Sequence, residues 1–209
     1  MAFIVPLDGY HLTRKQLAAL PNAEEAVFRR GAAFTFDAES YMKLVQKLRQ
    51  PIEATTGTIF APSFDHAIKD PIENDVAIPK SARIIIFEGL YTALDRPGWR
   101  EAATLMDELW FVECPIEVAE ERVAKRNFAA GISASYEESL NRTRKSDMRN
   151  AREIMAERLE VMETIQSIQD ESWKSPELKD GEAEADATRR PPKERMDSIA
   201  EMASNGVGM

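Results

Sequence analysis

Two acidic residues stand at the ends of apolar runs that are typical of buried strands. Asp8 follows the run from Phe3 to Leu7, and Glu88 follows the run that begins at Arg83. Because the carboxyl ends of parallel strands meet at one edge of a sheet, where ligands bind, we expect the two carboxylates to lie together. Phosphoryl transfer needs one acid that organises magnesium and one that accepts a hydroxyl proton. A single acid after a strand is more simply a cap of a turn or helix, so the pair carries the prediction.

Two arginines on the helix predicted at 115–130 are candidates for nucleotide contacts. Arg122 and Arg126 could close over a triphosphate and offset the charge that develops during transfer. Glutamates alternate with the cations along this helix and the next one, so a solvated surface with ion pairs is the alternative. We favour that alternative for the other cations and keep Arg122 and Arg126 as candidates.

Two short segments place an acid beside aromatic residues in or near loops. One ends at Asp37, and the other contains Phe64 and Asp65. Apolar walls that exclude water, with carboxylates that accept hydroxyl hydrogen bonds, are typical of a pocket for a polyhydroxy molecule. Asp37 fits equally well as the N-cap of the next helix, and both roles can coexist. His11 and His66 lack the tight spacing of metal ligands, so a surface or pocket position is the simpler interpretation.

The elements expected to position these residues alternate between strands and helices, which indicates an α/β fold with a parallel sheet. Prolines interrupt the region 58–79, so it is expected to form a short-stranded lid or substrate arm. Apolar runs and amphipathic patterns predict strands at 3–7, 83–89 and 109–113, helices at 37–48 and 115–130, and one long charged helical stretch that opens at Ser135.

Composition limits the classes of partner. The chain has 209 residues, of which 44% are hydrophobic, and a formal net charge of -9. This charge argues against a protein that grips a nucleic-acid backbone or an anionic membrane over a wide surface. The single cysteine, Cys114, excludes an intramolecular disulfide, and no apolar run approaches the length of a membrane span. We expect a cytoplasmic globular protein whose residues 174–209, charged and poor in aliphatic periodicity, form a disordered tail.

Five motifs follow one another along the chain. They are Val5-Pro6-Leu7-Asp8-Gly9-Tyr10-His11, Arg30-Gly31-Ala32-Ala33-Phe34-Thr35-Phe36-Asp37, Ala61-Pro62-Ser63-Phe64-Asp65-His66, Ile86-Phe87-Glu88-Gly89 and Trp110-Phe111-Val112-Glu113. In this order they resemble the uridine kinase, phosphoribulokinase and pantothenate kinase group of P-loop kinases, nearest to its fungal, incompletely characterised branch. The resemblance runs from about Val5 to Trp173, and five ordered motifs are far more specific than one.

The resemblance implies a P-loop NTPase-like parallel sheet flanked by helices. It also implies transfer of the γ-phosphate of ATP to a hydroxyl of a nucleoside, sugar or pantothenate-like molecule. Asp8 would activate the acceptor hydroxyl, Glu88 with Asp8 would support Mg²⁺, and Arg122 with Arg126 would lie in a lid over the nucleotide. The acceptor pocket implied by the resemblance is lined by Tyr10, His11, Asp37, Phe64, Asp65 and Lys69.

The sequence departs from that branch in two small ways and one large way. Leu90 and Ser146 stand where the branch usually carries Asn. None of the nine glycines begins a Gly-x-x-x-x-Gly-Lys-Ser/Thr run, whose backbone N–H groups and lysine hold the phosphates. We therefore expect residues 1–173 to be a partial P-loop kinase domain that lacks the first strand, the phosphate loop and the first helix. Lid arginines alone cannot replace the geometry of that loop.

Three functions stay open at this point. The chain is an ATP-dependent small-molecule kinase known from a shortened sequence, a non-catalytic pseudokinase-like binding or interaction protein, or a decayed gene product. The partner expected for the first two is a small molecule, without nucleic acid or membrane. Exposed sheet edges also lead us to expect a homodimer.

Overall fold

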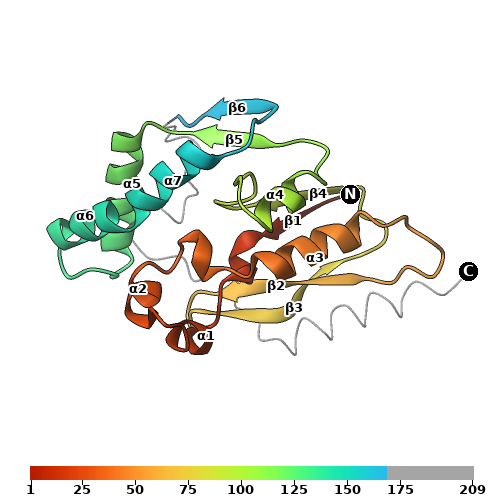
Figure 1. The fold of residues 1–209 in the computed structure, drawn as a ribbon, viewed down its shortest axis with the longest axis horizontal. Coiled ribbons are helices and arrows are strands. Elements are labelled where there is room, and N and C mark those ends of the chain that lie inside the picture. Colours follow the sequence, from red (N-terminus) through yellow and green to blue (C-terminus); the bar gives the residue numbers. More distant parts are fainter. Residues whose placement is uncertain (169–209) are drawn as a thin grey trace, which may run out of the picture. The chain divides into compact units, whose positions relative to one another are not determined.

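The chain alternates strands and helices, which confirms the predicted α/β class (Figure 1). The structure is a computed structural model that describes residues 1–168, and every element lies in the unit Met1–Ser167. The predicted domain boundary at 173 and the tail at 174–209 lie outside the described residues.

The strands are β1 (Ala2–Pro6), β2 (Ile59–Asp65), β3 (Asp70–Ile78), β4 (Ile84–Glu88), β5 (Trp110–Glu113) and β6 (Glu163–Gln166). The helices are η1 (Leu7–Tyr10), α1 (Arg14–Ala18), α2 (Ala23–Phe28), η2 (Ala33–Thr35), α3 (Ala38–Leu48), α4 (Trp99–Ala103), α5 (Ile116–Ala129), α6 (Tyr136–Lys145) and α7 (Asp147–Glu157), with η1 and η2 of the 3-10 type.

The strands of the described region pair two by two. β1 and β4 are parallel, with Pro6 opposite Glu88, and β5 and β6 are parallel, with Trp110 opposite Glu163. β2 and β3 form an antiparallel hairpin. The register of β1 and β4 places the carboxyl ends of both strands at the same edge, as the sequence predicted.

The helical stretch predicted from Ser135 is present and consists of two helices, α6 and α7. Ser135 does cap α6, since its side chain accepts a hydrogen bond from the backbone N–H of Glu138. A break at Ser146 then separates α6 from α7, and Arg158 adopts an extended conformation that ends α7. The following β6 pairs with β5, a contact between residues far apart in sequence that no local pattern indicates.

The region predicted as a proline-interrupted arm is a hairpin with a β-bulge. Ala61 pairs with Val76 and Ser63 with Ile72, so that Pro62 alone opposes the three residues 73–75. Proline lacks the N–H that a regular ladder needs, and a bulge removes that requirement. The bulge is the physical reason why β2, a strand of seven residues, tolerates Pro62.

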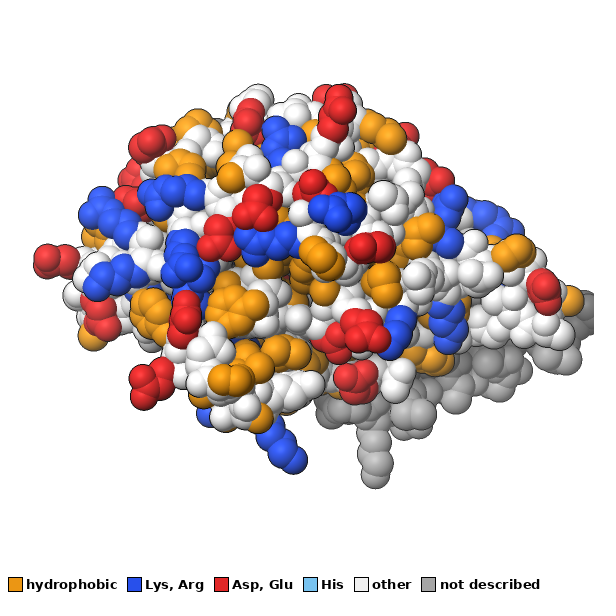
Figure 2. All heavy atoms as spheres, viewed as in Figure 1, with side chains coloured by type: hydrophobic (Ala, Val, Ile, Leu, Met, Phe, Trp, Pro, Cys, Tyr) orange, Lys and Arg blue, Asp and Glu red, His pale blue; other side chains and the backbone are white. Residues whose placement is uncertain are grey.

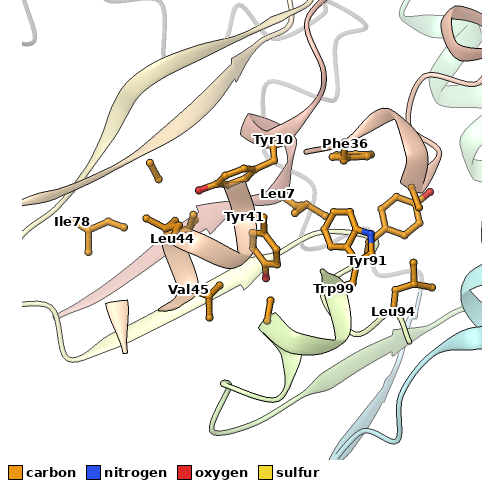
Figure 3. Packing of buried hydrophobic residues seen from close by; sticks show 14 of the residues in the cluster. Leu7, Tyr10, Phe36, Tyr41, Leu44, Val45, Ile78, Tyr91, Leu94 and Trp99 are labelled. Atoms are coloured by element: carbon orange, nitrogen blue, oxygen red, sulfur yellow. The ribbon is translucent and has the colours of Figure 1, made fainter. Parts of the chain in front are cut away.

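The core forms between α3, η1 and the segments that follow β4 (Figure 3). The apolar face predicted for α3 is confirmed, because Tyr41, Leu44 and Val45 are buried. Aromatic rings fill the centre, where Trp99 lies with its ring centroid 5.6 Å from those of both Tyr41 and Tyr91. Edge-to-face and tilted aromatic contacts of this kind stabilise the core beyond the burial of area alone. The core therefore supports η1, the turn that carries Asp8.

The outer faces of β1 and β4 are open. Ile4, Ile84 and Ile86 are 62%, 58% and 49% exposed, as expected from the sequence for strands without a full set of neighbours. A cleft of about 970 Å³ runs along β4 to the start of β5. On the face drawn in Figure 2, acidic, basic and hydrophobic side chains are interspersed. None of the described helices is long and apolar enough to cross a membrane.

Candidate functional site

The turn after β1 presents Asp8 at the carboxyl edge of the β1–β4 pair. Leu7 and Tyr10 are buried and anchor the turn, whereas Asp8 stays exposed. Glu88 is the last residue of β4 and is exposed at the same edge, opposite Pro6. The two predicted acids thus lie at the same edge of the β1–β4 pair, and their roles in holding a cation and taking a proton stay predictions.

Gly9 allows the hairpin to lie directly on this turn. A Cβ atom at Gly9 would stand 2.2 Å from the carbonyl oxygen of Pro62, far inside van der Waals contact. Any larger residue would therefore push β2 away from η1. The close approach fixes the hairpin bulge beside Tyr10.

His11 joins three of the sequence motifs. Its ring stacks on Phe36 with centroids 3.9 Å apart and lies 5.0 Å from the ring of Phe64, while its Nε2 is 3.7 Å from Oδ1 of Asp8. Burial lowers the pKa of His11 to about 4; the charge of Asp8 raises it and that of Arg30 lowers it further. His11 is consequently neutral at physiological pH and places an uncharged polar ring beside the Asp8 carboxylate.

Arg30 holds the hairpin turn against this site, a role that the sequence did not assign. Its guanidinium donates hydrogen bonds to the backbone carbonyls of Leu12 and Lys69 and to Oδ1 of Asp70, the last at 3.2 Å. The guanidinium carbon also lies 5.2 Å from the centroid of Phe64. In the sequence, the only signal for this role was that Arg30 opens the motif that contains Phe34 and Phe36. The partners of Arg30 could not be predicted, because they lie up to 40 residues away in sequence.

A cavity of about 290 Å³ opens beside the same turn. It is lined by three of the predicted residues, Tyr10, His11 and Asp37. Tyr10 is 5% exposed as a residue, and its hydroxyl makes no hydrogen bond to any described residue. Burial, followed by the charges of Glu73 and Asp37, raises the pKa of Tyr10 well above its usual range. The polar lining residues that sequence reasoning missed are Thr13, Gln16, Ser40, Lys43, Lys47 and Glu73.

Asp37 is both a helix cap and a wall of the cavity, so the two roles left open by the sequence coexist. Its Oδ1 accepts a hydrogen bond from the backbone N–H of Ser40 at 2.9 Å, and its Oδ2 accepts one from the Ser40 hydroxyl at 2.7 Å. This geometry is that of an N-cap, extended by the side chain of Ser40.

Three further candidates lie at the hairpin turn and not on the wall of this cavity. Asp65 accepts hydrogen bonds from the backbone N–H groups of Ala67 and Ile68, and so closes the turn. Lys69 adopts a positive φ of 57° there, and Phe64 packs on His11. The substrate contacts assigned to Phe64, Asp65 and Lys69 stay predictions.

The two candidate lid arginines on α5 have different surroundings. Arg122 donates hydrogen bonds to Oγ of Ser167 at 2.9 Å and to Sγ of Cys114 at 3.6 Å. Arg126 is exposed and lies close enough to Asp147 for its charge to lower the pKa of that carboxyl, although burial is the larger effect and raises it. Nucleotide binding by either arginine stays a prediction, and Arg126 is the less constrained of the two.

The residues of the candidate site suit a magnesium ion, but they include no phosphate-binding loop for a triphosphate. Asp8 and Glu88 offer the oxygen ligands that Mg²⁺ prefers, and this ion usually takes its remaining ligands from water and substrate phosphates. Within residues 1–168, no group of three or more His, Cys, Asp or Glu side chains could enclose a metal by itself. For the phosphates, the sequence offers no Gly-Lys pair.

Several proteins of similar sequence are described as kinases. No family model matches the chain. The chain is 50% identical to an ATP-dependent kinase-like protein, notR', of Aspergillus versicolor over 159 residues, which are 76% of this chain and 92% of that protein. It is 40% identical to a candidate uridine kinase of Schizosaccharomyces pombe over 70% of this chain and 61% of that protein. It is 33% identical to the ATP-dependent kinase YFH7 of Zygosaccharomyces rouxii, of which it spans 48%.

Two solved structures with a similar fold are also described as kinases. A candidate fructose transport system kinase from Silicibacter sp. TM1040 superposes with a TM-score of 0.68 at 30% identity, over 78% of this chain and 74% of that chain. YFH7 from Saccharomyces cerevisiae, described as a P-loop-containing kinase with a circular permutation, superposes with a TM-score of 0.71 at 30% identity. That match covers 81% of this chain and 58% of the YFH7 chain. The chain therefore spans about half the length of its YFH7 relatives.

Proposed function

Because the chain belongs to the uridine kinase-like, ATP-dependent P-loop kinases, we propose that its described residues form the acceptor side of a small-molecule kinase. This is the part that binds a hydroxyl-bearing molecule and prepares the hydroxyl to receive the γ-phosphate of ATP. The observation that carries the proposal is the position of Asp8. It lies at the same sheet edge as Glu88 and next to His11, which lines a cavity of about 290 Å³.

In this proposal Asp8 takes the proton of the acceptor hydroxyl as the hydroxyl oxygen bonds to the γ-phosphorus and ADP leaves. Glu88 would hold Mg²⁺, and Asp8 would offer a second oxygen ligand. His11, neutral and stacked on Phe36, supports the Asp8 carboxylate without competing for the proton. ATP and Mg²⁺ supply the phosphoryl group and its charge neutralisation; we assign no residue to the phosphate cradle, because none in this sequence fits it.

The proposed acceptor is a nucleoside, a sugar or a pantothenate-like molecule. The names of the relatives support the first two classes, since one is a candidate uridine kinase and another a candidate fructose transport system kinase. Both named acceptors present several hydroxyl groups in a small volume. The cavity beside Tyr10 offers a polar wall of the kind that such molecules need.

A second function is favoured by one specific observation, the absence of a Gly-Lys pair from the sequence. In this alternative the chain is a pseudokinase-like binding protein that retains the acceptor pocket and does not transfer phosphate. A cytoplasmic location stays a prediction for both functions.

Acceptor-dependent release of ADP distinguishes the two functions. The full chain is mixed with Mg²⁺ and ATP, and ADP is measured with and without uridine, D-fructose or pantothenate. A kinase releases ADP only with an acceptor, and Asp8→Asn lowers the rate about 10²- to 10⁴-fold because the general base is lost. Binding of an acceptor without ADP release supports the binding protein. Absence of both binding and turnover contradicts both functions.

A further inference from the structure

The cavity of the proposed acceptor site has two carboxylates on its wall, and only one of them is free. Both oxygens of Asp37 already accept hydrogen bonds from Ser40, at 2.9 and 2.7 Å. Glu73 accepts no hydrogen bond and forms no ion pair with any residue that the structure describes. Glu73 is an exposed residue of the cavity wall, and a carboxylate has acceptor sites for several donors and makes strong, charge-assisted hydrogen bonds. Glu73 is therefore the carboxylate that is available to a ligand.

The hairpin bulge is what brings Glu73 to the cavity. Residues 73–75 of β3 stand opposite Pro62 alone, and Asn74 in the middle has a φ of 57°. Bulges change the direction of a side chain and occur often beside functional sites. The hydroxyl of Ser63 donates a hydrogen bond of 2.7 Å to Oδ2 of Asp75, which holds the bulge in this shape.

Tyr10 faces the same cavity with an unused hydroxyl. Its ring is buried and makes an edge contact with Tyr41 at 5.4 Å between centroids, which fixes its position. Tyr10 and Glu73 line the same cavity, and the charge of Glu73 acts on the Tyr10 hydroxyl. The Tyr10 hydroxyl makes no hydrogen bond to the described residues, so it is free to bond to a ligand in the cavity. Together Glu73 and Tyr10 offer one strong acceptor and one group that can donate or accept.

Two lysines, Lys43 and Lys47, also line the cavity. Lys43 is already paired with Glu39 at 2.6 Å, and Lys47 lies one helical turn further along α3. Two carboxylates act by their charge on the Tyr10 hydroxyl, Glu73 and Asp37. Of these two, Glu73 is the one without a protein partner among the described residues.

Building on the proposed acceptor site, we propose that Glu73 is its specificity-determining residue. It accepts hydrogen bonds from hydroxyl groups of an uncharged, hydroxyl-rich acceptor, a nucleoside or a sugar, beside the Tyr10 hydroxyl. An acceptor that brings a carboxylate, such as pantothenate, is repelled at this position.

Calorimetric titration of the full chain with uridine and with D-fructose tests this role. Glu73→Gln keeps the size of the side chain but removes its charge, and the dissociation constant of the bound probe should rise about tenfold or more. Glu24→Gln is the matched control, because Glu24 is an exposed acid on α2 that does not line the cavity, and it should leave the constant unchanged. A thermal melt of each variant verifies that it is folded.

The possible results separate the inference from the function on which it depends. Loss of affinity in Glu73→Gln, larger than any loss in Asp37→Asn, supports the inference. A probe that binds the unsubstituted chain and binds Glu73→Gln equally well overturns the role of Glu73 and leaves the proposed function standing. If neither probe binds the unsubstituted chain, the proposed acceptor site is wrong, and the role of Glu73 falls with it.

Discussion

The pKa of His11 depends on residues that the fold brings to it from distant parts of the chain. The sequence placed it near Asp8 and identified Phe36 and Phe64 as members of two aromatic–acid motifs. It could not show that both rings enclose His11, because these contacts join segments separated by 25 and 53 residues. The lowered pKa of His11 follows from that enclosure and not from any local pattern.

The stability of the protein should fall as the pH decreases from about 6.5 to about 4. In this window the unfolded chain protonates His11, whose ordinary pKa is 6.5, whereas the folded chain resists protonation until about pH 4. Each pH unit then removes up to about 1.4 kcal/mol from the free energy of unfolding. Urea unfolding at several pH values measures this slope.

His11→Phe provides the comparison for that slope. Phenylalanine retains the stacking with Phe36 and has no proton to bind, so the variant should lose the His11 part of the pH dependence. An identical slope in the variant would show that His11 is not held neutral by the fold.

At the scale of the elements, locally encoded features were predictable and long-range ones were not. The strands β1, β4 and β5 and the helix α3 follow from apolar runs and amphipathic spacing, and the structure confirms them. The bulge at Pro62 depends on the register between β2 and β3, and β6 depends on pairing with a strand about 50 residues away. For the same reason Glu73 has no sequence signal as a pocket residue, since only the bulge brings it there.

Gly9→Ala should separate the hairpin from η1. The added Cβ would meet the carbonyl oxygen of Pro62 at 2.2 Å, and both groups belong to backbone that cannot easily move. Overpacking of this kind costs about 1 to 3 kcal/mol. Chemical unfolding measures the loss, and weaker acceptor binding should accompany it, because the bulge that carries Glu73 is displaced.

Gly57→Ala is the control for that substitution. No atom lies within 4 Å of a Cβ built at Gly57, so alanine there should leave stability within about 0.5 kcal/mol of the original value or slightly raise it. Equal effects of the two substitutions would contradict the close contact between Gly9 and β2.

At the scale of the whole molecule, the open edge of β4 offers a surface for self-association. In the described region β4 has only β1 as a strand neighbour, and its exposed Ile84 and Ile86 border the large cleft. Exposed apolar strand edges tend to pair with another chain. We propose that the chain forms a homodimer through this edge.

Sedimentation equilibrium tests the homodimer. The double variant Ile84→Lys, Ile86→Lys should remain monomeric at concentrations where the original chain associates, because the charges oppose edge pairing. Val27→Lys is a matched control, since Val27 is 57% exposed on α2, away from the cleft. Equal masses for the original chain and the double variant would exclude the β4 edge as the interface.

Family membership was also predictable at this scale, because five ordered motifs survive in the sequence and the kinase relatives bear it out. The acceptor and the catalytic capacity of this chain could not be predicted from the sequence, because pocket acids and aromatic rings suit many hydroxyl compounds.

The central claim is that these residues form an acceptor site beside Asp8, and titration of the ¹⁵N-labelled full chain with uridine and D-fructose tests it most directly. At least one probe should shift the backbone amide signals of Gly9 to Leu12 and of Glu73, which line the cavity. Saturable shifts at these residues would support an acceptor site. Absence of shifts with both probes, or shifts confined to residues along the β4 cleft, would contradict it.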